Sequence, residues 1–563
     1  MGIRQSLQAH KGVKFLLFPL LILTFTFATA VADAFENLYK KASKELREGN
    51  FSNAEQLYRN ILDSNPEDEN ARVGLALVLL KQKNFALAYD EALKVLQTKP
   101  QNSRAEAIIG TALLRSGFFT LSVDHLNASL QINVKEPLAL ASAAEIDLYL
   151  NNPTEAFEKL KLATELDTDE PDYWILYART ASRLDLYRDA ADALRSYLKN
   201  APKTDKERRE RIEGVIRFYN YLGNTNIYKV SGSAAATVPI KVKAKRPHFE
   251  AKINGKESIR FVLDTGAGVT VISSKAAERL KLKEVARGGN AYAVGGSGTF
   301  PIIYSVIEEI DIAGVKIRNV PVYIRQIHSF SNSAEDAPEG YLGLSVLSNF
   351  FTTIDYKMGQ LSLRTTKEQK NRKSSEVGEA VPALFFAQEE QAQTLPTSVL
   401  PFRLTESGLI SVEVKLDNES SSLNFILDSG ASSSVISKSV VEKNNWDKKL
   451  LPNESVKIVG AAGITEDVKI MFANSLRVSD LVRENVRLPV INFAALNENS
   501  GFEQQGILGG DFLNSCRIEI DFTRLQVSVT PYCNGTIKKS LPISDKVSAE
   551  KMLNQELRSQ IDK

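Results

Sequence analysis

An internal duplication in the second half of the chain constrains its fold more than any other feature. The segment FVLDTGAGVTVIS, at residues 261–273, recurs as FILDSGASSSVIS at residues 425–437. Each copy is an apolar run that ends in Asp-Thr-Gly-Ala or Asp-Ser-Gly-Ala. One such motif is weak evidence, because Asp, Ser and Gly are common wherever a strand enters a turn. Two copies in the same setting predict two folded units of the same kind.

The two copies remain aligned further along the chain. The Gly-rich stretch AVGGSG, from Ala293, corresponds to IVGAAG from Ile458, and GYLGLSVL from Gly340 corresponds to GILGGDFL from Gly506. Around these stretches, Val, Ile, Thr, Phe and Tyr alternate with polar residues, which is the period of β-strands. We predict duplicated, mainly-β domains with these bounds: a first half over 235–366, a polar linker over 367–394, a second half over 395–535 and a polar tail over 536–563.

The order of these motifs resembles that of the aspartic peptidases of the retroviral type, the retropepsins. In both copies, a hydrophobic strand ending in Asp-Thr/Ser-Gly-Ala is followed by a Gly-rich hairpin and then by an apolar-apolar-Gly segment, at 341–343 and 507–509. Each copy is similar in length and order to one retropepsin-like subunit. The resemblance covers residues 240–533 and implies two acid-protease barrels that pair within one chain, as the two lobes of pepsin do.

The resemblance implies that Asp264 and Asp428 are the catalytic residues. Hydrolysis of an amide needs a base that takes a proton from water and an acid that protonates the substrate. Two carboxyl groups held a few ångströms apart supply both, because like charges at that distance resist double ionisation and the pair retains one proton. This chemistry requires neither a metal nor another cofactor, and we predict none.

The resemblance also assigns supporting roles to the residues that follow each aspartate. The hydroxyl groups of Thr265 and Ser429 are expected to hydrogen-bond across to the opposite loop. Gly266 and Gly430 are expected to allow close approach of the backbone, with their amides directed at the carboxylates. Each half would then contribute one half of an active site.

The Gly-rich stretches correspond to the flaps that close over the substrate in this family. The flap residues predicted from the two copies are Tyr292, Gly295, Gly296, Gly460 and Gly463. The denser glycines of the first copy predict that the first flap moves more than the second. The alternative interpretation is a pair of Gly-rich hairpins without a role in substrate binding.

The N-terminal third has a period of 34 residues, which is that of the tetratricopeptide repeat (TPR). Small residues recur at one position of each helix of the repeat: Ala42, Ala76, Gly110, Ala144 and Ala178 in the first helix, and Ala54, Ala88, Ser122, Ala156 and Ala190 in the second. The array over 35–222 resembles five TPRs and a capping helix, whose charged side is interpreted as a solvated face. Such arrays usually bind a peptide or a partner protein, and the alternative is a spacer.

The N-terminus has the features of a secretory signal. Basic residues precede an apolar run from Phe15 to Ala32, which ends in the small-x-small pattern of a cleavage site. We predict a signal peptide over 1–32 and a periplasmic or extracellular location. The alternative is an uncleaved membrane anchor, because the length of the run approaches that needed to span a bilayer.

The composition argues against other classes of function. The chain has 70 Lys and Arg against 68 Asp and Glu, so its net charge of +2 indicates no nucleic-acid surface. Four His and two Cys argue against a metal cluster. Cys516 and Cys533 flank a predicted hairpin, and in an exported protein they are expected to form a disulfide, with two free thiols as the alternative.

These features together predict a multi-domain protein, in which an all-α TPR solenoid is followed by mainly-β duplicated acid-protease barrels. The functional hypothesis is an exported aspartic endopeptidase whose repeats bind a protein partner or the substrate. One alternative is a catalytically inactive peptidase fold that holds a peptide while the repeats recruit a partner. Another is a homodimer in which each half pairs with its twin in a second chain.

Overall fold

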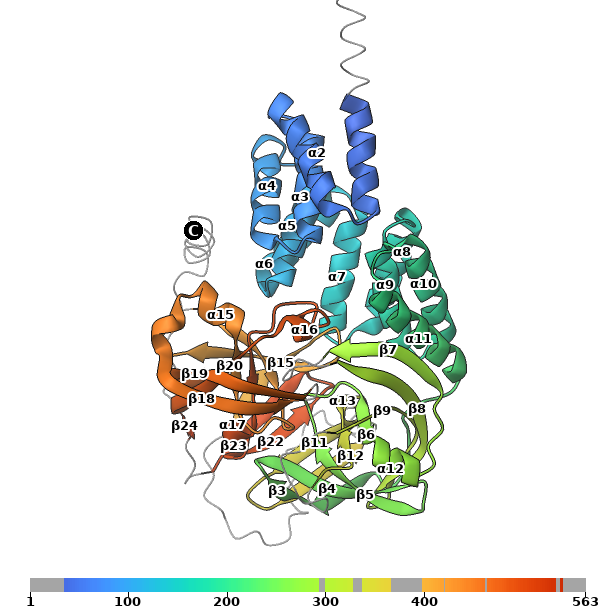
Figure 1. The fold of residues 1–563 in the computed structure, drawn as a ribbon, viewed down its shortest axis with the longest axis vertical. Coiled ribbons are helices and arrows are strands. Elements are labelled where there is room, and N and C mark those ends of the chain that lie inside the picture. The colour runs from blue at the N-terminus through green and yellow to red at the C-terminus, as the bar shows by residue number, and fades with distance from the viewer. Residues whose placement is uncertain are drawn as a thin grey trace, which may run out of the picture. The chain divides into compact units, whose positions relative to one another are not determined.

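The computed structural model describes residues 35–292, 299–327, 337–365, 397–419, 421–460, 463–532 and 537–539 (Figure 1). It divides into two compact units. Of the described residues, the first unit contains those up to Leu113 and Phe119–Ala139, and the second contains Leu114–Phe118 and those from Leu140 onward. The predicted signal peptide over 1–32 and linker over 367–394 lie outside the described residues. Within the described part of the chain, no helix has the length and apolar character needed to cross a membrane.

Eleven consecutive helices follow the 34-residue period. The first spans 35–47 and the last, α11, spans Lys206–Leu222. Between them lie α2 Phe51–Ser64, α3 Glu69–Lys81, α4 Phe85–Thr98, α5 Ser103–Arg115, α6 Phe119–Ile132, α7 Pro137–Tyr149, α8 Pro153–Leu166, α9 Pro171–Arg183 and α10 Tyr187–Asn200. From α3 to α10, every helix therefore begins 34 residues after its counterpart in the preceding repeat. The predicted TPR array is confirmed.

The turn inside each helix pair has the same backbone conformation in all five repeats. A residue with positive φ stands at one repeat position, in the order Gly49, Lys83, Gly117, Asn151 and Asp185. The left-handed region ends a helix within one residue, and Gly, Asn and Asp adopt it more readily than other residues. The regular spacing of these turns gives every helix pair the same geometry.

The small residues of the repeat lie where neighbouring helices approach each other. Ala42, Ala54 and Ala88 are completely buried. At Gly110, an added Cβ atom would lie only 2.7 Å from Cγ of Leu126. Because close-packed helices leave no room for that atom, the small-residue pattern of the sequence reflects helix packing.

The second unit contains two lobes, one from each half of the duplication. Lobe 1 is a nine-stranded sheet in the order β1-β9-β6-β10-β5-β4-β8-β7, with β3 paired to β4. Its strands are β1 Lys229–Gly232, β3 Lys241–Lys243, β4 Arg246–Ile253, β5 Glu257–Leu263, β6 Thr270–Ser273, β7 Ala286–Tyr292, β8 Thr299–Ile312, β9 Val315–Arg325 and β10 Gly340–Leu342.

Lobe 2 is a second nine-stranded sheet, and its central strands lie in the same order as the corresponding strands of lobe 1. Its order is β14-β15-β16-β21-β17-β20-β19-β18, with β24 paired to β20. Its strands are β14 Arg403–Leu404, β15 Ile410–Leu416, β16 Leu423–Leu427, β17 Val435–Ser437, β18 Leu450–Gly460, β19 Gly463–Val478, β20 Leu481–Ile491, β21 Gly506–Leu508 and β24 Ile537–Lys539. The strand β24 belongs to the segment that the sequence predicts as a polar tail.

A six-stranded sheet joins the lobes, in the order β13-β23-β22-β11-β12-β2. Its strands are β2 Ala235–Pro239, β11 Phe350–Asp355, β12 Gln360–Thr365, β13 Ser398–Pro401, β22 Cys516–Asp521 and β23 Gln526–Pro531. The two halves meet where β11 pairs antiparallel with β22, with Thr352 opposite Ile520. One hydrophobic core runs through both halves, so the halves pair within this chain.

Candidate active site

Each of the two predicted catalytic aspartates follows the end of a buried strand. Asp264 follows β5, and Asp428 follows β16. The amide of Asp264 donates to the carbonyl of Leu342 at 3.0 Å, and the amide of Asp428 donates to the carbonyl of Leu508 at 3.0 Å. The acceptors belong to the apolar-apolar-Gly segments of β10 and β21, which run parallel to β5 and β16. These segments therefore fix the position at which each aspartate leaves its sheet.

Hydrogen bonds of Thr265 and Ser429 join the two aspartate-bearing loops. Each hydroxyl donates to a backbone carbonyl of the opposite half, Thr265 to Leu427 at 2.7 Å and Ser429 to Leu263 at 2.7 Å. Each hydroxyl also accepts from the amide of the other residue, at 2.9 Å for Thr265 and 3.1 Å for Ser429. Both side chains are completely buried. We call these four bonds the hydroxyl lattice.

The hydroxyl lattice holds the two carboxyl groups against each other. The side chains of Asp264 and Asp428 share a hydrogen bond. The amide of Gly266 donates to Oδ1 of Asp264 at 2.9 Å, and the amide of Gly430 donates to Oδ1 of Asp428 at 2.8 Å. Asp428 accepts a further amide bond, from Ala431 at 3.0 Å. The two carboxyl groups thus lie in one site, with backbone donors on both sides.

Only glycine fits at the two positions after the hydroxyl residues. A Cβ atom at Gly266 would lie 2.3 Å from Cγ of Asp428, and one at Gly430 would lie 2.5 Å from Cγ of Asp264. Each glycine therefore contacts the aspartate of the other half. Any larger residue would push the two carboxyl groups apart.

Burial raises the pKa of both carboxyl groups above the usual value for aspartate. The negative charge of Asp428 and the hydrogen bond with it raise the pKa of Asp264 further. The amides of Gly430 and Ala431 act in the opposite direction on Asp428, because they stabilise its charged form. The pair therefore holds one proton above the pH at which an isolated aspartate loses it, and it titrates as a unit.

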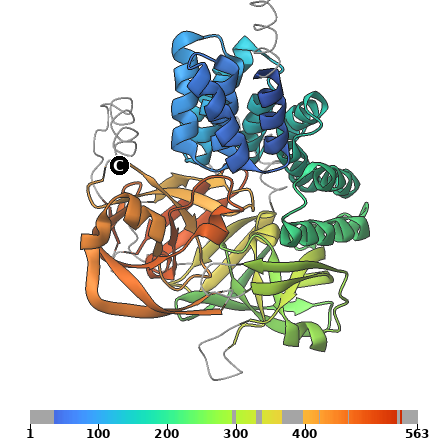
Figure 2. The same ribbon diagram turned by 45° about the horizontal axis from the view of Figure 1, so that its top comes forward.

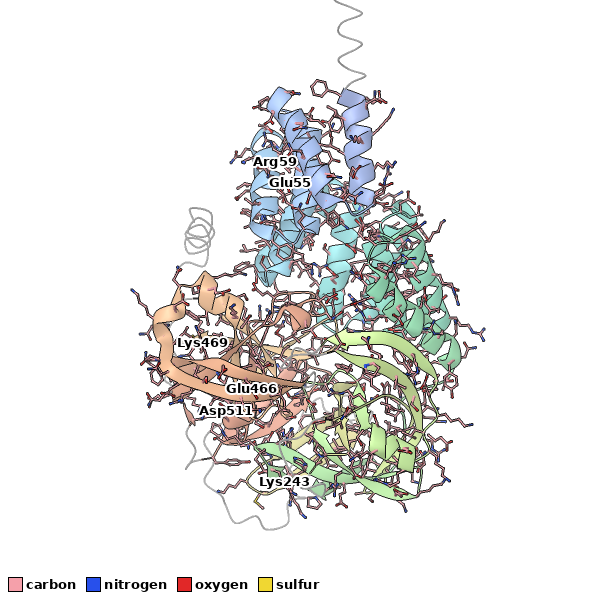
Figure 3. The ribbon with its side chains drawn as sticks, in the orientation of Figure 1. Glu55, Arg59, Lys243, Glu466, Lys469 and Asp511 are labelled. Atoms are coloured by element: carbon pink, nitrogen blue, oxygen red, sulfur yellow. The ribbon has the colours of Figure 1, made fainter. Side chains whose placement is uncertain are left out.

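A third carboxylate braces the aspartate loop of lobe 2. Asp511 lies on the short helix α17, Gly510–Leu513 (Figure 3). Its Oδ1 accepts from the amide of Ser434 at 2.7 Å and from the hydroxyl of Ser434 at 2.6 Å. The Ser434 hydroxyl in turn accepts from the amide of Gly509 at 3.0 Å. In lobe 1 the amide of Gly343 makes the equivalent bond, to the hydroxyl of Thr270 at 3.2 Å, but position 345 holds a serine where lobe 2 has Asp511.

The flap hairpin of lobe 1, formed by β7 and β8, contacts the last helix of the repeats. A Cβ atom at Gly214 of α11 would lie 2.2 Å from Cα of Gly288 in β7. Arg217 donates to the carbonyl of Arg287 at 2.8 Å, and Arg211 donates to the carbonyl of Asn290 at 3.5 Å. The charged side of α11 is therefore not simply a solvated face, because two of its arginines bind the backbone of the flap strand.

Aromatic packing extends this contact from β7 to β8. Phe218 of α11 stacks on Tyr304 of β8 with ring centroids 4.7 Å apart, and Tyr323 of β9 meets the other side of the hairpin at 5.3 Å from Tyr304. Tyr187 and Leu222 complete this cluster from the helical side. Figure 2 shows α8 to α11 stacked beside the strands of lobe 1, within the second unit. The repeats thus support the base of the first flap.

The flap hairpin of lobe 2, formed by β18 and β19, is more open to solvent. None of the residues of β18 is buried. Lys457 and Glu466 form an ion pair of 2.7 Å across the hairpin, with Glu466 on β19 (Figure 3). At the tip, Gly460 pairs with Gly463, which has a φ of 119°.

The sequence assigned the greater mobility to the first flap. Gly295 and Gly296 lie outside the described residues, and Tyr292 is described only as the end of β7, opposite Thr299. The relative motion of the flaps therefore stays a prediction. The contacts of α11 with β7 restrain the base of the first flap and therefore oppose greater mobility of that flap.

A buried ionic cluster, which the sequence did not reveal, joins the repeats to lobe 2. Glu406 binds Arg179, and Arg115 lies 3.4 Å from Glu406 and 2.5 Å from Glu145. Arg115 also donates to the carbonyl of Gly501 at 2.7 Å. The next residue, Ser407, approaches the aspartate loop of lobe 1, since a Cβ at Gly268 would lie 2.5 Å from its carbonyl oxygen. These residues hold the second half of the repeats and the barrels in one unit.

The predicted disulfide remains a prediction. Cys516 is buried at the start of β22, and its register partner on β23 is Pro531. Cys533 lies outside the described residues. Among the residues that the structure describes, no group of His, Cys, Asp and Glu side chains has the arrangement of a metal site.

Comparisons with known proteins agree with this architecture. Residues 249–346 and 412–512 match the family model described as aspartyl protease, and residues 39–103 match the family model described as tetratricopeptide repeat. The two protease segments contain the two candidate aspartates. The chain therefore carries a TPR array followed by two retropepsin-like aspartyl protease segments.

Solved structures with a matching region include TPR proteins. A thermophilic TPR protein of Thermus thermophilus is 20% identical, with a TM-score of 0.28, over 32% of this chain and 98% of that protein. The pilF protein of Pseudomonas aeruginosa is 18% identical, with a TM-score of 0.26, over 34% of this chain and 86% of that protein. No curated protein sequence matches the chain.

Proposed function

We propose that this chain is an exported aspartic endopeptidase, in which Asp264 and Asp428 together activate a water molecule for the hydrolysis of peptide bonds. The observation that carries the proposal is the close contact between these two partly buried carboxyl groups, which come from equivalent positions of the two halves and each lie against the glycine of the other half. Like charges in such contact cannot both ionise near the usual pKa of aspartate, so one carboxyl stays protonated while the other is charged.

The chemistry follows from this shared proton. The charged carboxylate takes a proton from water as the water oxygen attacks the carbonyl carbon of the scissile peptide bond. The protonated carboxyl gives its proton to the carbonyl oxygen, which leaves a tetrahedral diol. The diol then collapses: the charged carboxylate takes a proton from one diol hydroxyl, the C–N bond breaks, and the protonated carboxyl gives its proton to the departing amine. Water is consumed, no covalent intermediate with the protein forms, and the dyad returns to its starting state.

The supporting residues fit the same mechanism. The hydroxyl lattice fixes the separation of the carboxyl groups, and the amides of Gly266 and Gly430 stabilise negative charge on the dyad. Preorganised donors of this kind lower the cost of reaching the transition state, because they need no rearrangement during the reaction.

The repeats are proposed to bind a protein partner or the protein substrate. The TPR array offers an extended face of stacked helices, which is the usual platform for a peptide or a partner protein. The contacts of α11 with β7, and of Arg115 and Arg179 with Glu406, attach the second half of this array to the barrels. A bound protein would then be held close to the site that cleaves it.

Denatured casein provides a direct test of peptidase activity. Purified wild-type protein would be incubated with it from about pH 3 to about pH 8, the range over which a raised aspartate pair can hold one proton. Asp264→Asn and Asp428→Asn would be assayed alongside. Either substitution is expected to abolish cleavage, because each removes one member of the pair.

Asp447→Asn serves as the matched control, since Asp447 is an exposed residue of lobe 2. It is expected to retain the activity of the wild type. Activity that survives either dyad substitution would contradict the paired mechanism. Inactivity of the wild type at every pH would favour the alternative of a peptide-binding scaffold.

Export is part of the proposal and has its own test. A fusion of residues 1–40 to a reporter that is active only outside the cytoplasm is expected to give signal, because an apolar run preceded by basic residues directs secretion. The N-terminal residue of the purified mature protein would distinguish a cleaved signal peptide, with a start near Asp33, from a retained anchor.

A further inference from the structure

Strand register shows which residues of the two lobes occupy equivalent positions beside the dyad. Arg325, at the end of β9, lies opposite Ser273 of β6 in a parallel pair. Ile491, at the end of β20, lies opposite Ser437 of β17 in the corresponding parallel pair. Ser273 and Ser437 end the two duplicated segments. Arg325 and Ile491 are therefore equivalent.

Strand register also makes Tyr341 and Ile507 equivalent. Tyr341 of β10 lies opposite Val271, and Ile507 of β21 lies opposite Val435. Each residue immediately precedes the leucine whose carbonyl accepts from a dyad aspartate. Lobe 1 thus has Arg325 and Tyr341 where lobe 2 has Ile491 and Ile507.

Arg325 lies between the first flap and the dyad. Its guanidinium is 5.0 Å from the ring centroid of Phe300, which is the second residue of the flap strand β8. Its positive charge interacts with Asp264 and with Tyr341. Arg325 and Tyr341 are both only partly buried.

The equivalent wall in lobe 2 is apolar. Ile491 and Ile507 are each only 8% exposed and pack against the hydrophobic core. The two walls that flank a peptide in the dyad site therefore differ in one clear property, which is the presence of a cation in lobe 1.

We propose that Arg325 is a specificity-determining residue that selects a carboxylate side chain on the lobe 1 side of the scissile bond, while Ile491 leaves the lobe 2 side selective for an apolar side chain. This inference rests on the proposed endopeptidase function. It names the substrate class as peptides with an acidic residue on one side of the cleaved bond and an apolar residue on the other.

The physical reason is the charge of the dyad itself. In its working state the dyad carries one negative charge, which repels an acidic substrate residue next to it. A guanidinium within reach of the dyad and of the substrate residue makes an acidic residue favourable there, because it forms charge-assisted hydrogen bonds with a carboxylate. A site built in this way discriminates against an uncharged analogue, because that analogue forms no charge-assisted bond with the guanidinium.

The test compares two peptides that differ at one residue. A peptide library first identifies cleaved sequences, and matched peptides with Glu or Gln at the selected position are then assayed near pH 5.5, above the usual glutamate pKa of about 4.3. The wild type is expected to favour the Glu peptide in kcat/KM by about 10- to 100-fold, the value of one charge-assisted hydrogen bond. Arg325→Ile, which installs the lobe 2 residue, is expected to bring the ratio close to one.

The ratio of kcat/KM between the Glu and Gln peptides separates recognition of the substrate from any effect of Arg325 on the dyad. A change in dyad protonation alters cleavage of both peptides equally and leaves their ratio unchanged. Arg325→Lys is expected to retain part of the Glu preference, and Arg325→Glu is expected to favour a Lys peptide. The reciprocal Ile491→Arg is expected to create a preference for Glu on the other side of the bond.

Continued cleavage of the Gln peptide shows that a variant is folded. A Glu-to-Gln ratio that is the same in Arg325→Ile and the wild type would overturn this inference and leave the proposed function standing. If the wild type cleaves no peptide of the library, the proposed function fails, and the inference fails with it.

Discussion

The two halves of the barrel region have nearly the same interior but different surroundings. Both halves place an aspartate after a buried strand, link it through a hydroxyl and hold it with a glycine amide. Around that common core, the first flap rests on α11, whereas β18 of the second flap has no buried residue. The two halves therefore share the surroundings of their aspartates and differ in the contacts of their flaps.

The largest loss of activity is expected from substitution of Gly266 or Gly430, because each contacts the aspartate of the other half. In Gly266→Ala and in Gly430→Ala, the new methyl group would meet the aspartate of the other half at 2.3 or 2.5 Å. Each variant is expected to lose at least about 100-fold in kcat, because a displacement of about 1 Å in a catalytic group has that cost. Kinetics on casein-derived peptides would measure it.

Gly255→Ala is the control for these variants. Gly255 has a φ of 66° and no atom within 4 Å of an added Cβ, so its substitution strains the backbone without touching the dyad. A loss of kcat in Gly255→Ala similar to that in Gly266→Ala would contradict the proposed cause.

A second prediction concerns the symmetry of the hydroxyl lattice. Thr265→Val and Ser429→Ala each leave buried backbone groups of the opposite loop without a partner. Each is expected to lower the free energy of unfolding by about 1–3 kcal/mol. The double variant should lose about the sum, because each hydroxyl makes two of the four bonds and no bond is removed twice. Urea unfolding would test this, and a loss below about 0.5 kcal/mol in either single variant would argue against the hydroxyl lattice.

The contact between α11 and the first flap can be broken by adding one methyl group. Alanine at position 214 favours a helix by about 1 kcal/mol over glycine, yet its Cβ would overlap Gly288 of β7. Gly214→Ala is therefore expected to speed hydrogen exchange at residues 286–290 by about tenfold, a loss of about 1.4 kcal/mol in local stability. Exchange at residues 450–460 of the second flap should not change.

Glu207→Ala is the control within α11, because Glu207 is exposed. It is expected to leave exchange in both flaps as in the wild type. Faster exchange in the second flap, or slower exchange in the first, would show that α11 does not hold the first flap in the way described.

The smallest predicted effect is on the pH profile. Activity should fall at low pH, where both carboxyl groups are protonated, and at high pH, where both are charged. Since Arg325 lowers the pKa of Asp264, Arg325→Ile should raise that pKa and move the upper limb to higher pH, by about half a unit. Arg325→Lys should leave the limb in place, and Ile491→Arg should move it to lower pH. A downward shift in Arg325→Ile would contradict the assigned sign.

The features that recur in the sequence were the ones it predicted well. The repeat period, the small residues of the TPR helices and the pairing of equivalent motifs all depend on local patterns that occur more than once. Asp264 and Asp428 were predicted to be equivalent in this way, because strand, turn and offset are the same in both copies. The family resemblance then supplied the roles of Thr265 and Ser429.

The features that occur once were missed, because their partners lie far away in the chain. Arg115 reaches Glu406 across 291 positions, and Gly214 meets Gly288 with no motif at either site. The charged side of α11 was interpreted as solvated. The sequence of a helix shows which of its faces is polar, but it does not show that backbone carbonyls of another element accept hydrogen bonds from that face. A glycine in the middle of α11 was the one available signal of a close contact.

Pairing of the two halves within one chain is the central claim, and complementation tests it most directly. Asp264→Asn and Asp428→Asn would be purified separately, mixed in equal amounts and assayed on casein beside each variant alone and the wild type. Because each chain then lacks one member of its own dyad, the account predicts an active wild type and no activity in either variant or in the mixture. Activity that returns on mixing would contradict it, since the two carboxyl groups would then come from different chains.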